Sequence, residues 1–299
     1  MSSIFEILYH LEPDYNRKAF DLPEEVSNSL FEKIKELYEE DVVDECFQEI
    51  QRLMRVHYAY KNEQMIESER EFNPKDRFTE KDVILITYGD LIQSEDSMPL
   101  QTLHEFCTTY LKNSINTIHI LPFFPYSSDR GFAIKDFTQV DPHLGKWIDI
   151  EELKKSGYKL MFDGVFNHIS SKSKWFLEFQ NAHPYFKDFF ISFSTKDAIS
   201  EDHLKLIVRP RTSDLLTGVP TLEGKKMVWT TFSPDQIDLN FKNYKVLLKM
   251  IEILLLYIRK GADIIRLDAV TYIWAELGTS CAHLTQTHLV IKLFREILN

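Results

Sequence analysis

Two short stretches of the sequence combine carboxylates with a histidine or an arginine. Asp163 precedes Asn167 and His168, and Arg266 stands two residues before Asp268. Side chains two apart on a strand project from the same face, so we expect the Arg266 guanidinium to lie beside the Asp268 carboxylate and to lower its pKa. An ionised, oriented carboxylate can act as a nucleophile. The alternative is a buried ion pair with a purely structural role.

Other polar groups allow more than one interpretation. His168 on its own is more often a hydrogen-bonded core histidine than a catalytic group. Asp163, Asn167 and His168 could ligate a metal in a metal-dependent barrel hydrolase, but their spacing matches no zinc pattern and supplies few oxygens for Ca²⁺. We therefore expect no metal and no cofactor. Arg209 and Arg211 form a local basic spot, either solvated loop charges or an anion site, since guanidinium groups suit phosphate.

Four short apolar runs must position these groups. They are residues 82–88, 117–121, 158–163 and 262–268, and helical patterns lie between them at residues 100–112, 148–156 and 244–259. Near-continuous apolar runs are typical of parallel strands buried on both faces. Strands that alternate with helices indicate an α/β sheet or barrel, in which functional residues lie at the carboxyl ends of the strands. His168 and Asp268 both fall near such ends.

The chain divides into four expected segments. A helical N-terminal extension (1–80) carries two apolar stripes, and its charged part, 61–80, is expected to be a linker or exposed turn. The others are the first part of a catalytic barrel (81–168), an insertion (169–240) and the continued barrel (241–299). An insertion of about 70 residues far exceeds the usual βα loop of about 2–6 residues, so we expect it to roof the active face.

Composition excludes several classes of protein. Hydrophobic residues make up 44% and charged residues 27% of the chain, which is typical of a soluble folded protein and not of a disordered one. The net charge of −11, without a basic stripe, argues against nucleic-acid and anionic-membrane partners. Three distant cysteines without a CxxC pair, and no leader or spanning segment, predict a cytoplasmic protein.

The two polar stretches also carry a family resemblance. Residues 163–168 (DGVFNH) resemble the DxxxNH motif after strand three of the alpha-amylase superfamily (glycoside hydrolase family thirteen), and residues 261–270 (GADIIRLDAV) resemble its strand-four motif. Further similar strings are 121–132 (LPFFPYSSDRGF), 209–211 (RPR), 229–238 (WTTFSPDQID) and 275–281 (AELGTSC). The likeness is greatest to the sucrose phosphorylase and glucosylglycerate phosphorylase branch, and it implies a TIM (β/α)8 barrel with a long insertion after strand three.

The resemblance implies a role for each matching residue. Asp268 is implied as the nucleophile that forms a glucosyl-enzyme, with Arg266 orienting it. The glucosyl ring is expected to contact Asp129 and His168 through its hydroxyls and Phe132 and Phe232 through its apolar face. Gln236 is expected on the acceptor side, and Arg209 and Arg211 at the phosphate.

The resemblance also implies that about four βα units are present, the N-terminal part of such a barrel. The family's acid/base Glu follows strand five and a third Asp follows strand seven, so we expect this chain alone not to turn over a glucoside. The parent reaction is retaining phosphorolysis of a small α-glucoside, of the sucrose or glucosylglycerate type, with inorganic phosphate as co-substrate and glucose 1-phosphate as product. Alternatives are an α-glucoside hydrolase of the same superfamily and a non-catalytic truncated product.

Overall fold

A four-stranded parallel sheet forms the centre of the computed structural model, which describes residues 13–73 and 78–299. Its order is β1 (Ile84–Thr87), β2 (Thr117–Ile120), β3 (Lys159–Gly164) and β9 (Ala262–Leu267). β1, β2 and β9 lie within three of the apolar runs, β3 extends one residue beyond the run at 158–163, and all three pairings are parallel. The prediction of an α/β chain with a parallel sheet is therefore confirmed.

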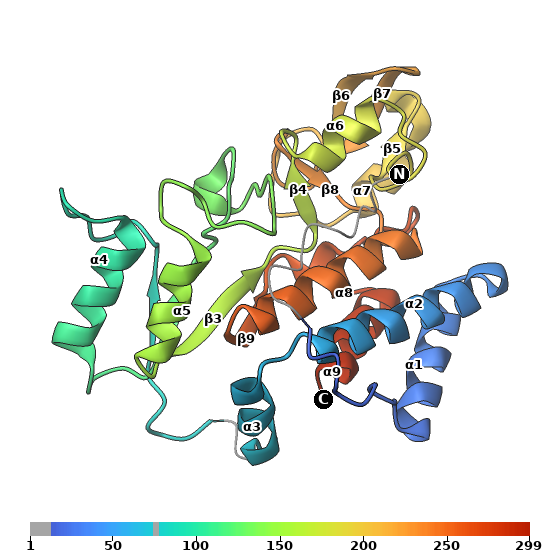
Figure 1. Cartoon of the computed structure of the whole chain (residues 1–299). Helices are drawn as coiled ribbons and strands as arrows, with labels where there is room; N and C mark the ends of the chain where they lie inside the picture. The colour runs from blue at the N-terminus through green and yellow to red at the C-terminus, as the bar shows by residue number, and fades with distance from the viewer. Residues whose placement is uncertain (1–12, 74–77) are drawn as a thin grey trace.

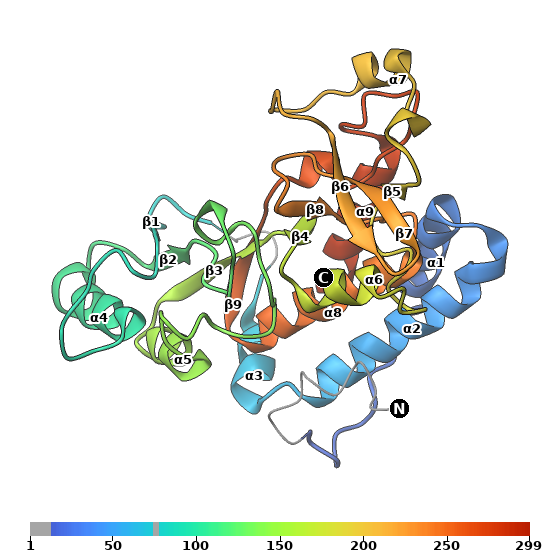
Figure 2. The ribbon, with the colours of Figure 1, turned by 90° about the horizontal axis from the view of Figure 1, so that it is seen from above.

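Helices cover one face of this sheet (Figures 1 and 2). They are α4 (Pro99–Phe106), α5 (Trp147–Lys155) and α8 (Tyr244–Arg259). Phe162 of β3 is fully buried on this side, where its ring packs edge-on against Tyr257 of α8. The predicted helix at residues 100–112 divides into α4 and a π-helical turn, Cys107–Leu111.

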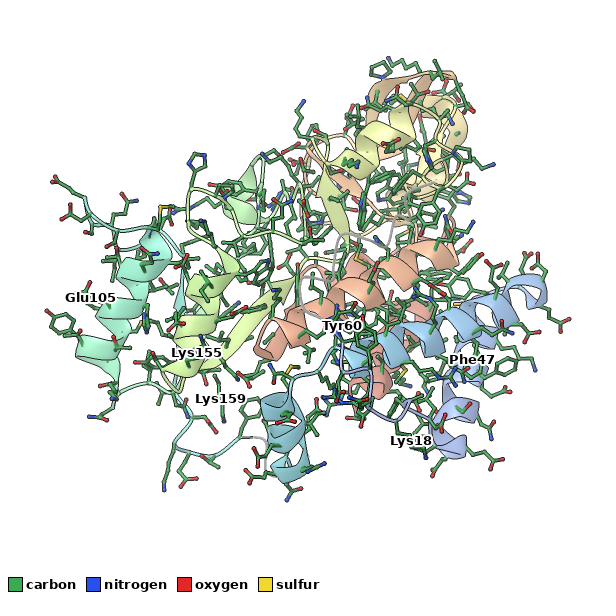
Figure 3. All side chains as sticks on the ribbon, in the orientation of Figure 1. Lys18, Phe47, Tyr60, Glu105, Lys155 and Lys159 are labelled. Carbon is green, nitrogen blue, oxygen red and sulfur yellow. The ribbon has the colours of Figure 1, made fainter. Side chains whose placement is uncertain are left out.

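The N-terminal helices pack on the far side of α8. They are α1 (Glu24–Leu37) and α2 (Glu40–Ala59), and α2 contacts α8 whereas α1 contacts the last helix, α9 (Thr285–Leu298). Because α8 is covered by the sheet on one side and by α2 on the other, most of its residues are buried, including the paired Lys249 and Glu252. The hydroxyl of Tyr38 donates to the carbonyl of Phe241 at 3.0 Å. The Arg259 guanidinium lies over the ring of Tyr60, and the side chain of Tyr60 is labelled in Figure 3.

The expected linker at 61–80 is partly wrong, because helix α3 (Glu63–Glu71) occupies its first half. Asn62 caps this helix by accepting a hydrogen bond from the Met65 amide at 2.8 Å. Its other residues are mostly strong helix formers, and Lys61 pairs with Glu69 at 2.6 Å. The segment lacks a buried face, so the cap and intrinsic propensity stabilise a helix that hydrophobic periodicity does not reveal.

The insertion between β3 and α8 contains regular structure of its own, at the top of Figure 1. Strands β4 (His168–Ser170) and β8 (Gln236–Asp238) pair antiparallel, and a second sheet has the order β5 (Ser192–Phe193), β7 (Gly224–Trp229), β6 (Leu216–Thr221). Two short helices, α6 (Lys174–Gln180) and α7 (Glu201–Leu206), accompany them. Single 3₁₀ turns lie at Asp129–Gly131, Lys196–Ala198 and Val270–Tyr272. In the ranges described here, every helix is too short or too polar to cross a membrane.

Candidate active site

The carboxyl end of β9 positions Asp268. In the parallel register, Asp163 of β3 lies opposite Arg266 of β9. The ladder continues one step further, because the Asp268 amide donates to the Gly164 carbonyl at 3.1 Å. The next residue, Ala269, has a left-handed backbone with φ +51°, so the chain turns away directly after Asp268. The backbone is thus fixed on both sides of this carboxylate.

Four side chains form a continuous row across β2, β3 and β9, which we call the charge row. His119 Nε2 lies 2.7 Å from one carboxylate oxygen of Asp163. The other Asp163 oxygen accepts from Arg266 Nη1, and Arg266 Nη2 lies 2.9 Å from Asp268 Oδ1. The row is buried at His119 and Asp163, whereas the Arg266 side chain is 41% exposed and the Asp268 side chain 19% exposed. The predicted pairing of Arg266 with Asp268 is therefore present.

The pKa expected for Asp268 is wrong in direction. Burial raises the pKa of Asp268 above its ordinary value, and the neighbouring Arg266 offsets only part of this effect. The carboxylates of Asp163 and Asp129 raise it further. The sequence pattern shows the guanidinium two residues away, but it does not show how deeply the strand end is buried or that two other acids face it.

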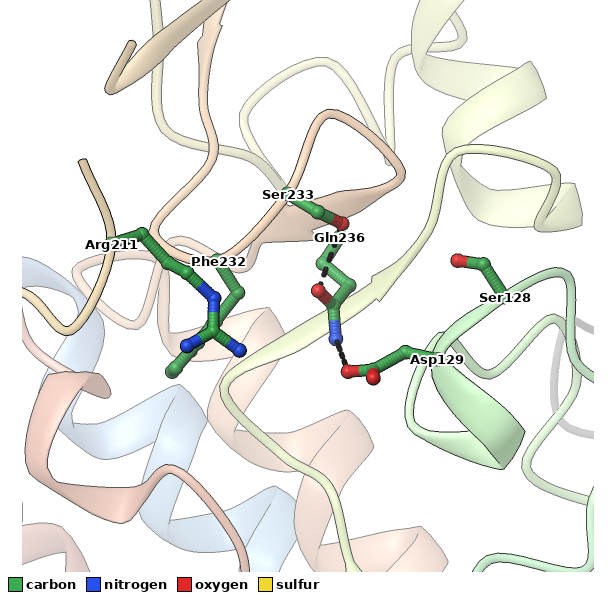
Figure 4. Close-up of a pocket in the computed structure, with 6 residues that line it drawn as sticks. All are labelled: Ser128, Asp129, Arg211, Phe232, Ser233 and Gln236. Atoms are coloured by element: carbon green, nitrogen blue, oxygen red, sulfur yellow. Dashed lines mark hydrogen bonds between the residues drawn. The ribbon is translucent and has the colours of Figure 1, made fainter. Parts of the chain in front are cut away.

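A cavity of about 250 Å³ lies at this end of the sheet. It is lined by Ser128, Asp129, Arg211, Phe232, Ser233 and Gln236, shown in Figure 4. The Ser233 hydroxyl donates to Gln236 Oε1 at 2.8 Å, and Gln236 Nε2 donates to Asp129 at 2.9 Å. This chain of hydrogen bonds fixes the orientation of the Gln236 amide and leaves the second Asp129 oxygen for a ligand hydroxyl.

A left-handed turn presents Asp129 to the cavity. Asp129, Arg130 and Gly131 have φ angles of +54°, +47° and +104°, a run of conformations that costs free energy unless the surroundings enforce it. A Cβ at Gly131 would lie 2.4 Å from the Pro122 carbonyl oxygen, so this position requires glycine. The Arg130 guanidinium stacks 4.4 Å from the centre of the Tyr88 ring, which holds the turn against the end of β1.

His168 lies behind the cavity wall. Its side chain is almost completely buried, and its Nε2 donates to the Phe132 carbonyl at 2.9 Å. Burial lowers the pKa of His168 to about 4, so the ring is neutral at pH 7. Its ring centre is 5.1 Å from that of Phe232, and Arg266 lies over the ring of Phe132 at 6.0 Å. Phe132 therefore connects the charge row to the cavity.

The two arginines of the basic spot have different surroundings. Arg209 donates from Nε to the Thr231 carbonyl at 3.1 Å and from its η nitrogens to the carbonyl and hydroxyl of Ser213. Arg211 lines the cavity and donates to the Pro210 carbonyl at 3.2 Å. The guanidinium of Arg209 is thus bonded to the loops of the insertion, whereas Arg211 brings positive charge to the cavity.

Several residues of the site escaped the sequence analysis. His119 was included only as part of a strand, although a histidine inside an apolar run is a usable signal. The carboxylate of Asp235 accepts from Ser128 and, at 2.6 Å, from Ser171, which ties the loop after β2 to the insertion; no local pattern predicts this contact. Among residues 13–73 and 78–299, no His, Cys, Asp and Glu side chains are grouped as a metal site would require.

Comparisons with known proteins show the family of the chain. Residues 108–290 match the alpha-amylase catalytic domain. The chain is 49% identical to a glucosylglycerate phosphorylase of Allomeiothermus silvanus over 74% of its own length and 39% of the relative's. It is 32% identical to a sucrose phosphorylase of Streptococcus mutans, over 66% and 41%.

A solved structure shows the same fold. The crystal structure of sucrose 6F-phosphate phosphorylase from Thermoanaerobacter thermosaccharolyticum superposes with a TM-score of 0.67 at 26% identity, over 74% of this chain and 47% of that one. The chain thus spans less than half the length of these relatives. Because the domain match covers more than half of its own residues, the chain belongs to the alpha-amylase family.

Proposed function

We propose that this chain carries the glucosyl-binding and nucleophile part of a retaining phosphorylase, which transfers a glucosyl unit between a small acceptor and inorganic phosphate. The observation that carries the proposal is the Asp268 carboxylate, paired with Arg266 at 2.9 Å at the end of β9. It lies at the same edge of the sheet as Asp129, whose charge acts on it. A carboxylate held in this way can attack an anomeric carbon and form a covalent glucosyl-enzyme.

The cavity supports the remaining roles. The free oxygen of Asp129 and the amide of Gln236 suit sugar hydroxyls, and the ring of Phe232 suits an apolar sugar face. Arg211, which lines the cavity, suits phosphate. We assign phosphate contact to Arg211 and a supporting role to Arg209, because the Arg209 guanidinium is bonded to Thr231 and Ser213.

The acceptor belongs to the same proposal. Relatives named for glucosylglycerate match at 45–49% identity, against 32% for the sucrose phosphorylase. We therefore favour a small anionic acceptor of the glycerate type over fructose. The positive charge of Arg211 at the cavity is compatible with either phosphate or an acceptor carboxylate.

Leaving-group protonation is the step that the described residues do not support. Retaining transfer uses a second carboxyl group about 5–5.5 Å from the nucleophile. Asp163 is bonded to His119 and Arg266, and Asp129 accepts from Gln236. Glu276 pairs with Lys242 at 2.5 Å on the surface. We therefore propose that the isolated chain processes unactivated glucosides about 10²–10⁴-fold more slowly than an enzyme with a positioned acid.

An activated donor tests the nucleophile without a general acid. With α-glucosyl fluoride, an Asp268 oxygen forms the bond to the anomeric carbon while the carbon–fluorine bond breaks and fluoride leaves. Intact-mass spectrometry is expected to show one glucosyl unit on the chain and none on Asp268→Asn, with Glu276→Gln as a labelled control. Absence of label on the wild-type chain would refute the assigned nucleophile.

Addition of phosphate separates the two enzymatic alternatives. Phosphate is expected to remove the label and yield glucose 1-phosphate, because a phosphate oxygen attacks the anomeric carbon and the Asp268 carboxylate leaves. A label that water removes at the same rate with and without phosphate would instead identify a hydrolase. Sucrose and glucosylglycerate, incubated with phosphate, then test the expected slow turnover of unactivated glucosides, and glucose 1-phosphate formed at ordinary enzyme rates would contradict it.

A further inference from the structure

We propose that His119 is a positioning residue for the nucleophile: it occupies one oxygen of Asp163 and thereby keeps the Arg266 guanidinium shared with Asp268. The inference rests on the proposed function only in that Asp268 is taken to be the nucleophile. The positioning itself concerns bonds among the four residues of the charge row. His119 lies within β2, two strands away from β9 and Asp268. Its side chain bonds to Asp163, which is not one of the residues that line the cavity.

The geometry divides each shared group between two partners. Asp163 offers one oxygen to His119 Nε2, at 2.7 Å, and the other to Arg266 Nη1. Arg266 offers Nη1 to Asp163 and Nη2 to Asp268, the latter at 2.9 Å. The guanidinium therefore bridges two carboxylates with one nitrogen on each.

This sharing competes with a stronger arrangement. An arginine fork and a carboxylate prefer two parallel hydrogen bonds between the same two groups. Asp163 is fully buried, so both of its oxygens require donors. If His119 supplied none, the second oxygen would recruit the other guanidinium nitrogen. Arg266 could respond, because its side chain is 41% exposed whereas the buried Asp163 cannot turn to solvent. Asp268 would then lose its partner.

The neighbouring charges make this loss consequential. Asp268 faces the carboxylates of Asp163 and Asp129 as well as Arg266. Without Arg266 beside it, two like charges and burial would act on Asp268 uncompensated, which favours its protonated, non-nucleophilic form. His119 thus acts on the reacting carboxylate through two intervening side chains and not by contact.

Two substitutions separate positioning from packing. His119→Phe keeps an aromatic volume but removes the donor, whereas His119→Gln returns an N–H at a reach similar to that of Nε2. The carboxyl resonance of Asp268, assigned with Asp268→Asn, is followed by carbon-detected NMR as a function of pH. We expect its midpoint to move to higher pH in His119→Phe and to stay at the wild-type position in His119→Gln.

The titration requires no sugar, so its outcome is independent of the proposed reaction. An unchanged midpoint in a folded His119→Phe variant would overturn the inference, as would an equal shift in His119→Gln. If the phenylalanine variant does not fold, His119→Asn replaces it, because the shorter amide cannot reach Asp163. If the glucosyl label forms on the wild-type chain, His119→Phe is also expected to slow labelling at pH values below both midpoints, about tenfold for each pH unit by which the Asp268 midpoint has moved, because the rate follows the ionised fraction of Asp268.

Discussion

Replacement of Arg266 by methionine is expected to destabilise the fold mainly through Asp163. Methionine keeps much of the apolar stem but removes both charge-assisted hydrogen bonds. Loss of the bond to the fully buried Asp163 is expected to cost about 1.5–3 kcal/mol, because one carboxylate oxygen is left without a donor. The contact with Asp268 adds about 0–1 kcal/mol, since the arginine side chain is 41% exposed. The free energy of unfolding should therefore fall by about 1.5–4 kcal/mol.

Urea unfolding at pH 7 measures this cost in two backgrounds. In Asp163→Asn the buried charge is absent, so Arg266→Met is expected to cost about 1–2 kcal/mol less there than in the wild-type chain. The control is Lys154→Met, which breaks the more exposed pair with Asp263 and is expected to cost less than about 1 kcal/mol. If Arg266→Met costs the same in both backgrounds, to within about 0.5 kcal/mol, the coupling inferred from the structure is refuted.

Three further substitutions test separate parts of the site. Burial lowers the pKa of His168 from 6.5 to about 4, so as pH falls the imidazole is protonated in the unfolded chain before it is protonated in the folded one. The stability that is present above pH 6.5 is therefore lost as the pH falls toward 4. His168→Gln should reduce this pH dependence of the free energy of unfolding in urea, and an unchanged pH dependence would contradict the argument. Arg209→Ala should lower stability by about 1–3 kcal/mol, whereas Arg211→Ala should melt like wild type and lose phosphate-dependent removal of the glucosyl label; the reverse pattern would interchange their roles. Gly131→Ala should lower the free energy of unfolding by about 1–3 kcal/mol more than Gly157→Ala, as measured by thermal or urea unfolding. Position 157 also has a positive φ, but a Cβ there would meet open space. Equal costs would show that the clash at position 131 is relieved.

The sequence predicted elements whose burial dominates their stability. Helix α8 begins and ends at the expected residues, since apolar residues recur at helical spacing along it, and β9 lies within the apolar run at 262–268. The pairing of Arg266 with Asp268 followed from the two-residue period of a strand. Period and apolar content are local properties, so they can be read without knowledge of the partners.

Properties that depend on distant neighbours could not be read in the same way. The pKa of Asp268 is raised because burial, together with Asp163 of β3 and Asp129 of the loop after β2, outweighs the adjacent guanidinium. The different environments of Arg209 and Arg211 arise from contacts with Ser213 and Thr231 that tertiary folding creates. Helix α3 was missed for the opposite reason, since it depends on a local cap and buries almost nothing.

The packing of α2 on α8 has a consequence for synthesis on the ribosome. Tyr38, at the end of α1, bonds to Phe241, which lies 203 positions further along the chain. At about 5–20 residues per second, the first two helices emerge roughly 10–40 s before the segment that covers their apolar side. During this interval the apolar sides of α1 and α2 are exposed and can be bound by chaperones that recognise amphipathic helices. The order of translation thus leaves the apolar sides of α1 and α2 uncovered until α8 and α9 have been made.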